Sequence, residues 1–116
     1  MYLIVFFLIF AFDVPVFSAE NPITLAEIDS QHEKSQLQTE YQEIASQIEK
    51  VLASNPNQYP WQWRQARTQY SLAKKAGESK SDHYDLCILH SSRAIDLQPD
   101  SAVSYFYRGL CRGKQG

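Results

Sequence analysis

Apolar residues recur at steps of three and four along most of this chain, which is the spacing of one face of an α-helix. In the first long stretch they stand at Leu37, Tyr41, Ile44, Ile48 and Leu52. No stretch alternates apolar and polar residues with the period of two that marks a strand. We therefore predict an all-α fold, with helices over residues 24–54, 60–76, 82–97 and 101–112.

Local signals place the ends of these helices. Thr24 with Glu27 three residues later fits a capping box, and the chain from there to residue 54 has neither Gly nor Pro, which predicts one long N-terminal helix. Pro56 and Pro99 are stops, and Gly77 stands where a C-terminal cap is expected. Because the connections around the two prolines are short, we expect consecutive helices to form antiparallel hairpins.

The first residues, MYLIVFFLIFAFDVPVFSAE, have the character of an export segment. The apolar run from Tyr2 to Phe12 is too short for a bilayer crossing, which takes about 20 helical residues, but it suits the core of a secretory signal. No Lys or Arg precedes the run. We predict a cleaved signal over residues 1–18, a single domain over residues 19–116, and localisation to the periplasm or cell envelope. The alternatives are an uncleaved membrane anchor and a buried N-terminal helix.

One segment of the sequence occurs twice, at an offset of 43 residues. EKVLASNPNQYPWQWRQAR aligns with SRAIDLQPDSAVSYFYRGL, so that Pro56 falls on Pro99. Each copy contains a helix end, a proline stop, an aromatic residue and then a small residue three positions later. The aromatic and small pairs are Trp63 with Ala66, and Phe106 with Gly109. Repetition of this kind predicts a solenoid of helix pairs.

The second copy, RAIDLQPDSAVSYFYRGL, resembles the junction between two tetratricopeptide repeats (TPRs), and the resemblance extends over roughly residues 44–116. It implies a short TPR-like solenoid, preceded here by the long N-terminal helix. It also implies that Ala94 is a packing alanine, that Pro99 closes a repeat, and that Gly109 lies against the third helix where no side chain fits. The usual TPR period is 34, so the extra residues would lie in a loop at residues 77–83.

The TPR resemblance also implies a binding surface. First helices of successive TPR pairs line a groove that holds peptides, and aromatic residues with Arg are frequent interface anchors. The corresponding candidates for partner binding are Trp63, Arg64, Arg67, Tyr70 and Phe106. The alternative is that Trp63 and Tyr70 are core residues, while the two arginines are exposed. Three positions depart from the family, because polar residues stand where it is usually apolar: Gln62, Gln65 and Gln69.

Charge narrows the class of partner. The formal net charge is −2, without the basic excess of a nucleic-acid binder, so we expect another protein or a peptide instead. Residues 20–57 carry seven acids against two bases, whereas residues 58–116 carry nine bases against five acids. The two halves could attract each other, or the charges could belong to solvated helix faces.

A possible metal site lies in DHYDLCILH. His83, Cys87 and His90 share one helix face and are good zinc or copper ligands, with Asp82 or Asp85 as a fourth. We favour the simpler interpretation of a small core cysteine between polar histidines, and we predict no metal and no cofactor. The sequence has no Gly-rich phosphate loop and no recognisable catalytic set, so we do not expect an enzyme.

The two cysteines stand at equal distances from a turn. Cys87 precedes Pro99 by twelve residues and Cys111 follows it by twelve. In an antiparallel hairpin that turns at Pro99, the two side chains reach the same height, and packed helices allow the Cα separation of a disulfide. Export would supply an oxidising compartment. We predict a possible Cys87–Cys111 disulfide, with two separate core cysteines as the alternative.

Taken together, these features favour an exported TPR-like adaptor that binds another protein. One alternative is a structural subunit of a larger transport or envelope assembly, and a minor one is a metal-handling protein. The sequence ends partway through what would be a second full repeat, which predicts either a terminal capping helix or a truncated C-terminus.

Overall fold

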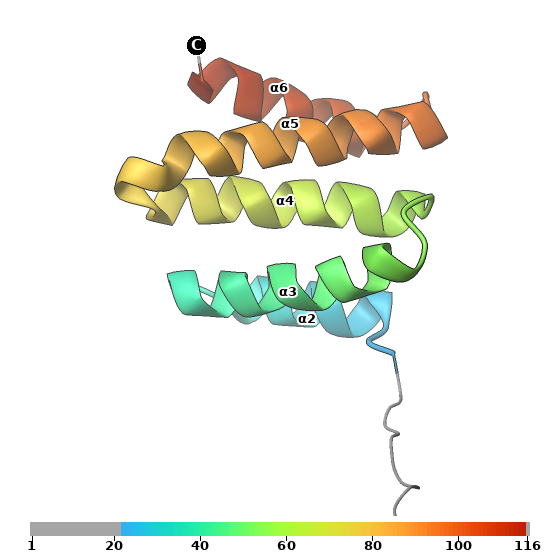
Figure 1. Cartoon of the computed structure of the whole chain (residues 1–116), viewed down its shortest axis with the longest axis horizontal. Coiled ribbons are helices and arrows are strands. Elements are labelled where there is room, and N and C mark those ends of the chain that lie inside the picture. The colour runs from blue at the N-terminus through green and yellow to red at the C-terminus, as the bar shows by residue number, and fades with distance from the viewer. Residues whose placement is uncertain (1–21, 116) are drawn as a thin grey trace, which may run out of the picture.

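The computed structural model describes residues 22–115, in which every regular element is a helix and no strand is present (Figure 1). The elements are α2 (Leu25–Lys34), α3 (Gln38–Ser54), α4 (Tyr59–Lys75), the 3₁₀-helix η2 (Gly77–Ser79), α5 (Lys80–Leu97) and α6 (Ala102–Gln115). The predicted all-α class is confirmed for these residues. The expected signal over residues 1–18 lies outside them. None of the helices described combines the length and apolar character needed to cross a membrane.

The helices follow one another up and down in a row. Figure 1 shows α3, α4, α5 and α6 side by side in chain order, with α2 behind α3 and each helix antiparallel to the one before it. The central helix is α4, which contacts each of the other four α-helices. The positions of all candidate functional residues therefore depend on α4.

The predicted long N-terminal helix is wrong, because two helices occupy its place. The chain leaves helical geometry at Ser35 and Leu37, whose ψ angles are 145° and 150°. The Glu40 carboxylate caps the new helix by accepting hydrogen bonds from the backbone N–H groups of Gln36 and Leu37. The Tyr41 hydroxyl closes the turn by donating to the Ser35 carbonyl oxygen. An acid at the third helical position can thus start a helix without a preceding Gly or Pro.

The other helix ends follow local signals closely. Thr24 and Glu27 form the predicted capping box at the start of α2. Gly77 follows α4 with a φ of +60°, the left-handed conformation that glycine adopts most readily. The expected loop at residues 77–83 is nearly absent, however, since η2 leads directly into α5 at Lys80. A tight helical connection therefore replaces the extra loop.

Two apolar clusters lie on opposite sides of α4. The first joins α2, α3 and α4 through Ile28, Ile44, Ile48, Leu52 and Trp61. The second joins α4, α5 and α6 through Ala66, Ala73, Tyr84, Cys87 and Cys111. Because α4 contributes to both clusters, it is covered on most of its circumference.

Polar α4 side chains lie in the same interfaces. Gln62 is fully buried and its amide donates to the Pro56 carbonyl oxygen, while its Oε1 atom is 2.7 Å from His90 Nδ1. One turn further, the amide of buried Gln65 donates to the Ala45 carbonyl oxygen. These glutamines therefore form hydrogen bonds with polar groups of neighbouring segments inside the fold.

The predicted close packing of Gly109 is wrong. Gly109 is exposed, and a Cβ atom added there would have no neighbour within 4 Å. The buried positions of α6 are instead Ser104 and Cys111, with Ser101 just before the helix. The prediction chose the wrong buried face of α6, because this helix turns small and polar residues toward α5 and leaves bulky ones exposed.

Candidate protein-binding surface

Aromatic side chains from α4 and α6 form one continuous group. Tyr107 is at its centre: its ring is stacked on Trp63 with centroids 6.5 Å apart, and it lies 6.2 Å from Tyr70 and 5.1 Å from Phe106. We call Trp63, Tyr70, Phe106 and Tyr107 the aromatic surface. Tilted and edge-to-face contacts at these distances hold aromatic rings in fixed positions.

Exposure differs across this surface. Phe106 leaves 58% of its area in contact with solvent, whereas Trp63, Tyr70 and Tyr107 are half-buried. Burial of the Tyr107 phenol raises its pKa, because desolvation disfavours the phenolate. The surface thus offers one protruding ring next to three rings that the fold holds in place.

Cationic side chains lie over these rings. The guanidinium carbons of Arg64 and Arg67 are 4.3 and 5.1 Å from the centre of the Trp63 ring, and the Lys74 ammonium is 4.9 Å from the Tyr70 ring. Cation–π contacts within about 6 Å are attractive and favour this arrangement. The surface therefore combines aromatic area with positive charge.

The two arginines are not exposed, contrary to expectation. Their side chains keep only 14% and 12% of their accessible area, because Asp29 of α2 binds both. Arg64 donates to Asp29 from Nε and Nη2 at 2.8 and 2.9 Å, and Arg67 donates from Nη2 at 2.7 Å. The Arg64 hydrogen bond, with the Arg67 contact, lowers the pKa of Asp29 to about 2. The carboxylate is thus ionised and fixes both guanidinium groups.

The structure brings together all five candidates for partner binding, since Trp63, Arg64, Arg67 and Tyr70 lie on one helix and Phe106 reaches them through Tyr107. Sequence reasoning missed Tyr107 and Asp29. Tyr107 directly follows Phe106, and the helical spacing did not reveal which of the two rings points toward α4. The opposite charges of the two halves of the chain were a signal for Asp29, but they could not single out one acid among seven.

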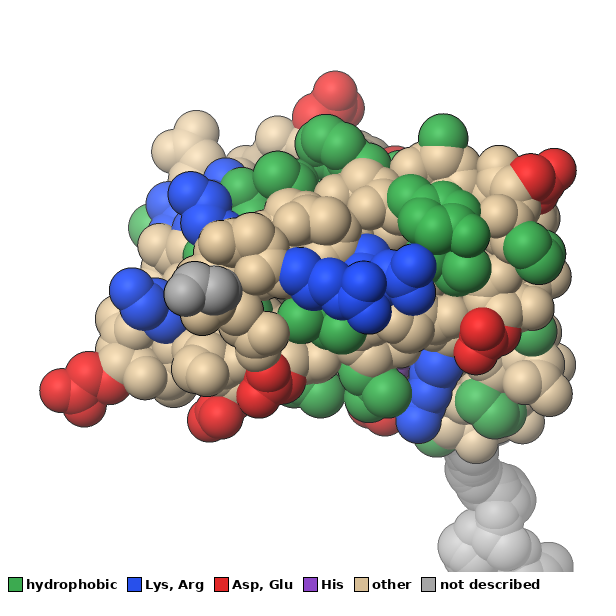
Figure 2. Space-filling view, turned by 90° about the horizontal axis from the view of Figure 1, so that it is seen from above, with side chains coloured by type: hydrophobic (Ala, Val, Ile, Leu, Met, Phe, Trp, Pro, Cys, Tyr) green, Lys and Arg blue, Asp and Glu red, His purple; other side chains and the backbone are tan. Residues whose placement is uncertain are grey.

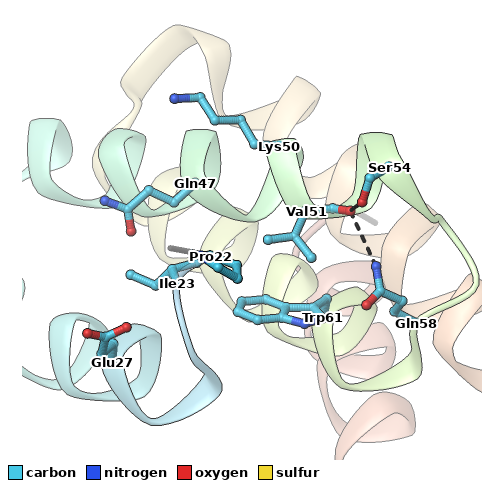
Figure 3. A pocket seen from close by; sticks show the side chains of 9 residues that line it. All are labelled: Pro22, Ile23, Glu27, Gln47, Lys50, Val51, Ser54, Gln58 and Trp61. Atoms are coloured by element: carbon cyan, nitrogen blue, oxygen red, sulfur yellow. Dashed lines mark hydrogen bonds between the residues drawn. The ribbon is translucent and has the colours of Figure 1, made fainter. Parts of the chain in front are cut away.

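A depression lies away from the aromatic surface, where α2, α3 and α4 meet. It has a volume of about 730 Å³ and is lined by Pro22, Ile23, Glu27, Gln47, Lys50, Val51, Ser54, Gln58 and Trp61 (Figure 3). Much of its polar lining is already bonded. The side chains of Ser54 and Gln58 both donate to the Val51 carbonyl oxygen, and Glu27 accepts from Thr24 in the capping box. Trp61, which lines it, belongs to the apolar cluster of α2, α3 and α4, and this cluster does not include Trp63.

The candidate metal ligands have other partners in the structure. Cys87 is joined to Cys111 by a disulfide with a Cα–Cα separation of 6.3 Å. The Nδ1 atoms of His83 and His90 lie within hydrogen-bond distance of Gln69 and Gln62. Over residues 22–115, no group of His, Cys, Asp and Glu side chains is arranged to hold a metal ion.

The disulfide fixes the position of α6. Both cysteines are fully buried, and the bond joins the middle of α5 to the second half of α6. At the other end of the hairpin, the Tyr59 hydroxyl and Ser101 Oγ are 2.7 Å apart, which ties the start of α4 to the start of α6. The aromatic surface is therefore built across α4 and α6, which the Tyr59–Ser101 contact joins directly and which the disulfide holds together through α5.

Comparison with protein-family models, with curated proteins and with solved structures finds no match for this chain.

Proposed function

We propose that this protein is a helical-repeat adaptor of the TPR type, exported to the periplasm or cell envelope, that binds a segment of another protein on its aromatic surface. The observation that carries the proposal is the ring contact of Tyr107 with both Trp63 and Phe106, which joins α4 and α6 into one surface with an exposed aromatic residue at its edge. Aromatic residues beside arginine are typical anchors of protein interfaces.

The positions of the prolines support a repeat. Pro56 precedes α4 and Pro99 precedes α6, and Pro22 precedes α2 in the same way. Pro22 and Pro56 lie 34 residues apart, which is the usual TPR period. The break at Ser35 to Leu37 thus gives the N-terminal region the shape of a further helix pair. On this interpretation α2, α4 and α6 are successive first helices, whose common side is the one that binds peptides in TPR proteins.

The chemistry of the surface favours an apolar or aromatic side chain next to an acidic group. Phe106 and the half-buried rings supply apolar contact area, and Lys74 supplies an exposed ammonium group over Tyr70. Arg64 and Arg67 are held on Trp63 by ionised Asp29, so these three residues together keep a net charge of +1 and need no ordering of long side chains on binding. The buried disulfide supports the exported location, because such bonds persist in oxidising compartments.

A peptide-display selection tests the proposal. Random peptides are selected on the protein with its disulfide intact and then retested on Phe106→Ser. Leu37→Ser is the matched control, because Leu37 is 62% exposed and lies at the N-cap of α3, far from α6 in the chain. We expect enriched peptides with aromatic and acidic residues that bind Leu37→Ser normally and lose binding to Phe106→Ser. Enrichment that survives Phe106→Ser would contradict the proposed surface.

A further inference from the structure

The outer face of α6 repeats the face that α4 uses to hold α5. On α4 this face contains Gln62, Ala66 and Gln69, where Gln62 contacts His90 and Gln69 contacts His83 of α5. Ala66 is fully buried between them in the cluster that contains Cys87. A residue without a long side chain at this central position allows the two helices to approach closely.

The same three positions recur in α6, 43 residues later, as Tyr105, Gly109 and Arg112. Tyr105 is 46% exposed, Arg112 is exposed, and Gly109 has free space where its Cβ would be. No described helix covers this face. We call Tyr105, Gly109 and Arg112 the α6 outer face. It lies on a different side of α6 from Tyr107, and it borders the aromatic surface at Phe106, which is three residues before Gly109.

Charge indicates what fits this face. Helix α6 contains three basic residues, Arg108, Arg112 and Lys114, and no acid. Figure 2 views the molecule from the α6 side and shows Lys and Arg side chains gathered beside hydrophobic ones. Arg108 borders the face, where its guanidinium lies 5.2 Å from the Tyr105 ring and donates to Ser92 of α5. A second copy of α6 packed on this face would bring like charges together, which costs free energy.

We propose that the α6 outer face is a docking site for an acidic amphipathic helix of a partner protein, which lies on α6 as α5 lies on α4. Its apolar strip would carry a small residue opposite Gly109, and its acidic flanks would face Arg108 and Arg112. The helix extends the row of antiparallel helices by one member. This inference does not rest on the proposed function, because Tyr105, Gly109 and Arg112 are not part of the aromatic surface.

Synthetic helical peptides of the length of α5 test the proposal. All share one apolar strip with a central alanine, and they differ only in having Glu or Lys at the flanking positions. Affinity is measured by isothermal titration for the native protein with its disulfide intact and for three variants, Gly109→Leu, Arg112→Glu and Leu37→Ser. Gly109→Leu fills the space that the docked helix needs in order to approach α6 closely. It causes no clash in the free protein, since nothing lies within 4 Å of that position.

We expect the Glu-flanked helix to bind and the Lys-flanked helix to fail. Gly109→Leu and Arg112→Glu should each weaken binding by about tenfold or more, and Leu37→Ser should leave it unchanged. Equal binding of the two peptides, no binding of either, or full binding to Gly109→Leu would overturn the proposal. A dimer in analytical ultracentrifugation that Gly109→Leu abolishes would also overturn it, by assigning the face to a second copy. The display-selected peptides and Phe106→Ser test the aromatic surface separately, so failure of the proposed function is distinguishable from failure of this docking site.

Discussion

At the scale of single residues, Asp29 determines the state of the two arginines beside Trp63. Arg64 and Arg67 are nearly buried, and a buried guanidinium group is costly unless a counter-charge and hydrogen bonds compensate it. Asp29 supplies both from α2, and it is itself 40% exposed. Its contribution is therefore smaller than that of a fully buried pair, because solvent screens part of the attraction.

Substitution of Asp29 by alanine should lower the free energy of unfolding by about 1–2 kcal/mol, because it leaves two nearly buried cations without their partner. Urea denaturation followed by circular dichroism measures the change. Glu33→Ala is the control, since Glu33 is an exposed acid on the same helix. If both substitutions cost equally little, the ion pairs do not hold the arginines in place.

His90 shows why α4 has buried glutamine side chains. The Gln62 amide already donates to Pro56, so its Oε1 atom accepts from His90 Nδ1. Desolvation by burial, the largest influence on this ring, lowers the pKa of His90 to about 4. A neutral, hydrogen-bonded imidazole thus stands in the interface between α4 and α5. Each such pair requires a specific alignment of α4 and α5, which favours one register over its neighbours.

At the scale of helices, most of the fold could be predicted from the sequence. The helical spacing of apolar residues and the proline stops predicted the all-α class and the order of the helices from residue 56 onward. Gly77 was also predicted correctly to end α4. The break at Leu37 was not predictable from these rules, because it depends on Glu40 reaching back to two backbone N–H groups. The face of α6 was misjudged because apolar spacing marks a face without saying whether another helix covers it.

Gly109 tests whether this side of α6 is exposed, as the structure shows. In an exposed helix interior, Gly→Ala removes a conformational penalty, so Gly109→Ala should raise the free energy of unfolding by about 0.5–1 kcal/mol. Thermal unfolding measures it. The matched control is Gly77→Ala, which should be destabilising by about 1 kcal/mol because the φ of +60° is strained for alanine. If Gly109→Ala instead lowers the free energy of unfolding, Gly109 packs in the α5–α6 interface and the exposed position is wrong.

The disulfide between α5 and α6 gives a second prediction at this scale. It closes a loop with a sequence separation of 24, and its removal in the double variant Cys87→Ala, Cys111→Ala should cost roughly 3 kcal/mol in the chain-entropy model. Urea denaturation of native and variant protein measures the cost. Intact-mass analysis after alkylation without reductant checks the bond itself, and two alkylated thiols in protein from an oxidising compartment would contradict it.

For the whole molecule, proton linkage predicts acid sensitivity. Burial lowers the pKa of His32 and of His90 to about 4 from the usual 6.5, so the unfolded chain binds protons first as the pH falls. Stability is therefore full above about pH 7 and declines toward pH 4, by up to about 3 kcal/mol for His90, the more buried ring. Below pH 4, protonation of Asp29, whose pKa is about 2 in the fold, continues the decline. Urea midpoints measured from pH 8 to pH 3 check this. A constant midpoint from pH 7 to pH 4 would show that these histidines are solvated.

As a whole, the molecule is a row of antiparallel helices, with the aromatic surface across α4 and α6 and the α6 outer face uncovered by any described helix. The candidate site was partly predictable, because Trp63, Tyr70 and Phe106 follow from helical spacing and the internal repeat. The remaining parts arise from tertiary contacts: Tyr107 links the two helices, and Asp29 comes from a helix about 35 residues away in the sequence. Neither contact is encoded in local spacing.

The most direct test of the central claim uses the two tryptophans of the chain as reporters. Trp63 lies on the aromatic surface, while Trp61 is only 8% exposed and belongs to the cluster with Ile28 and Ile44. A peptide selected by display is titrated into ¹⁵N-labelled protein, and the two indole N–H resonances are followed by NMR. We predict that the Trp63 resonance shifts with the added peptide while the Trp61 resonance stays in place. A shift confined to Trp61, or no shift of either while the peptide binds, would contradict binding at the aromatic surface.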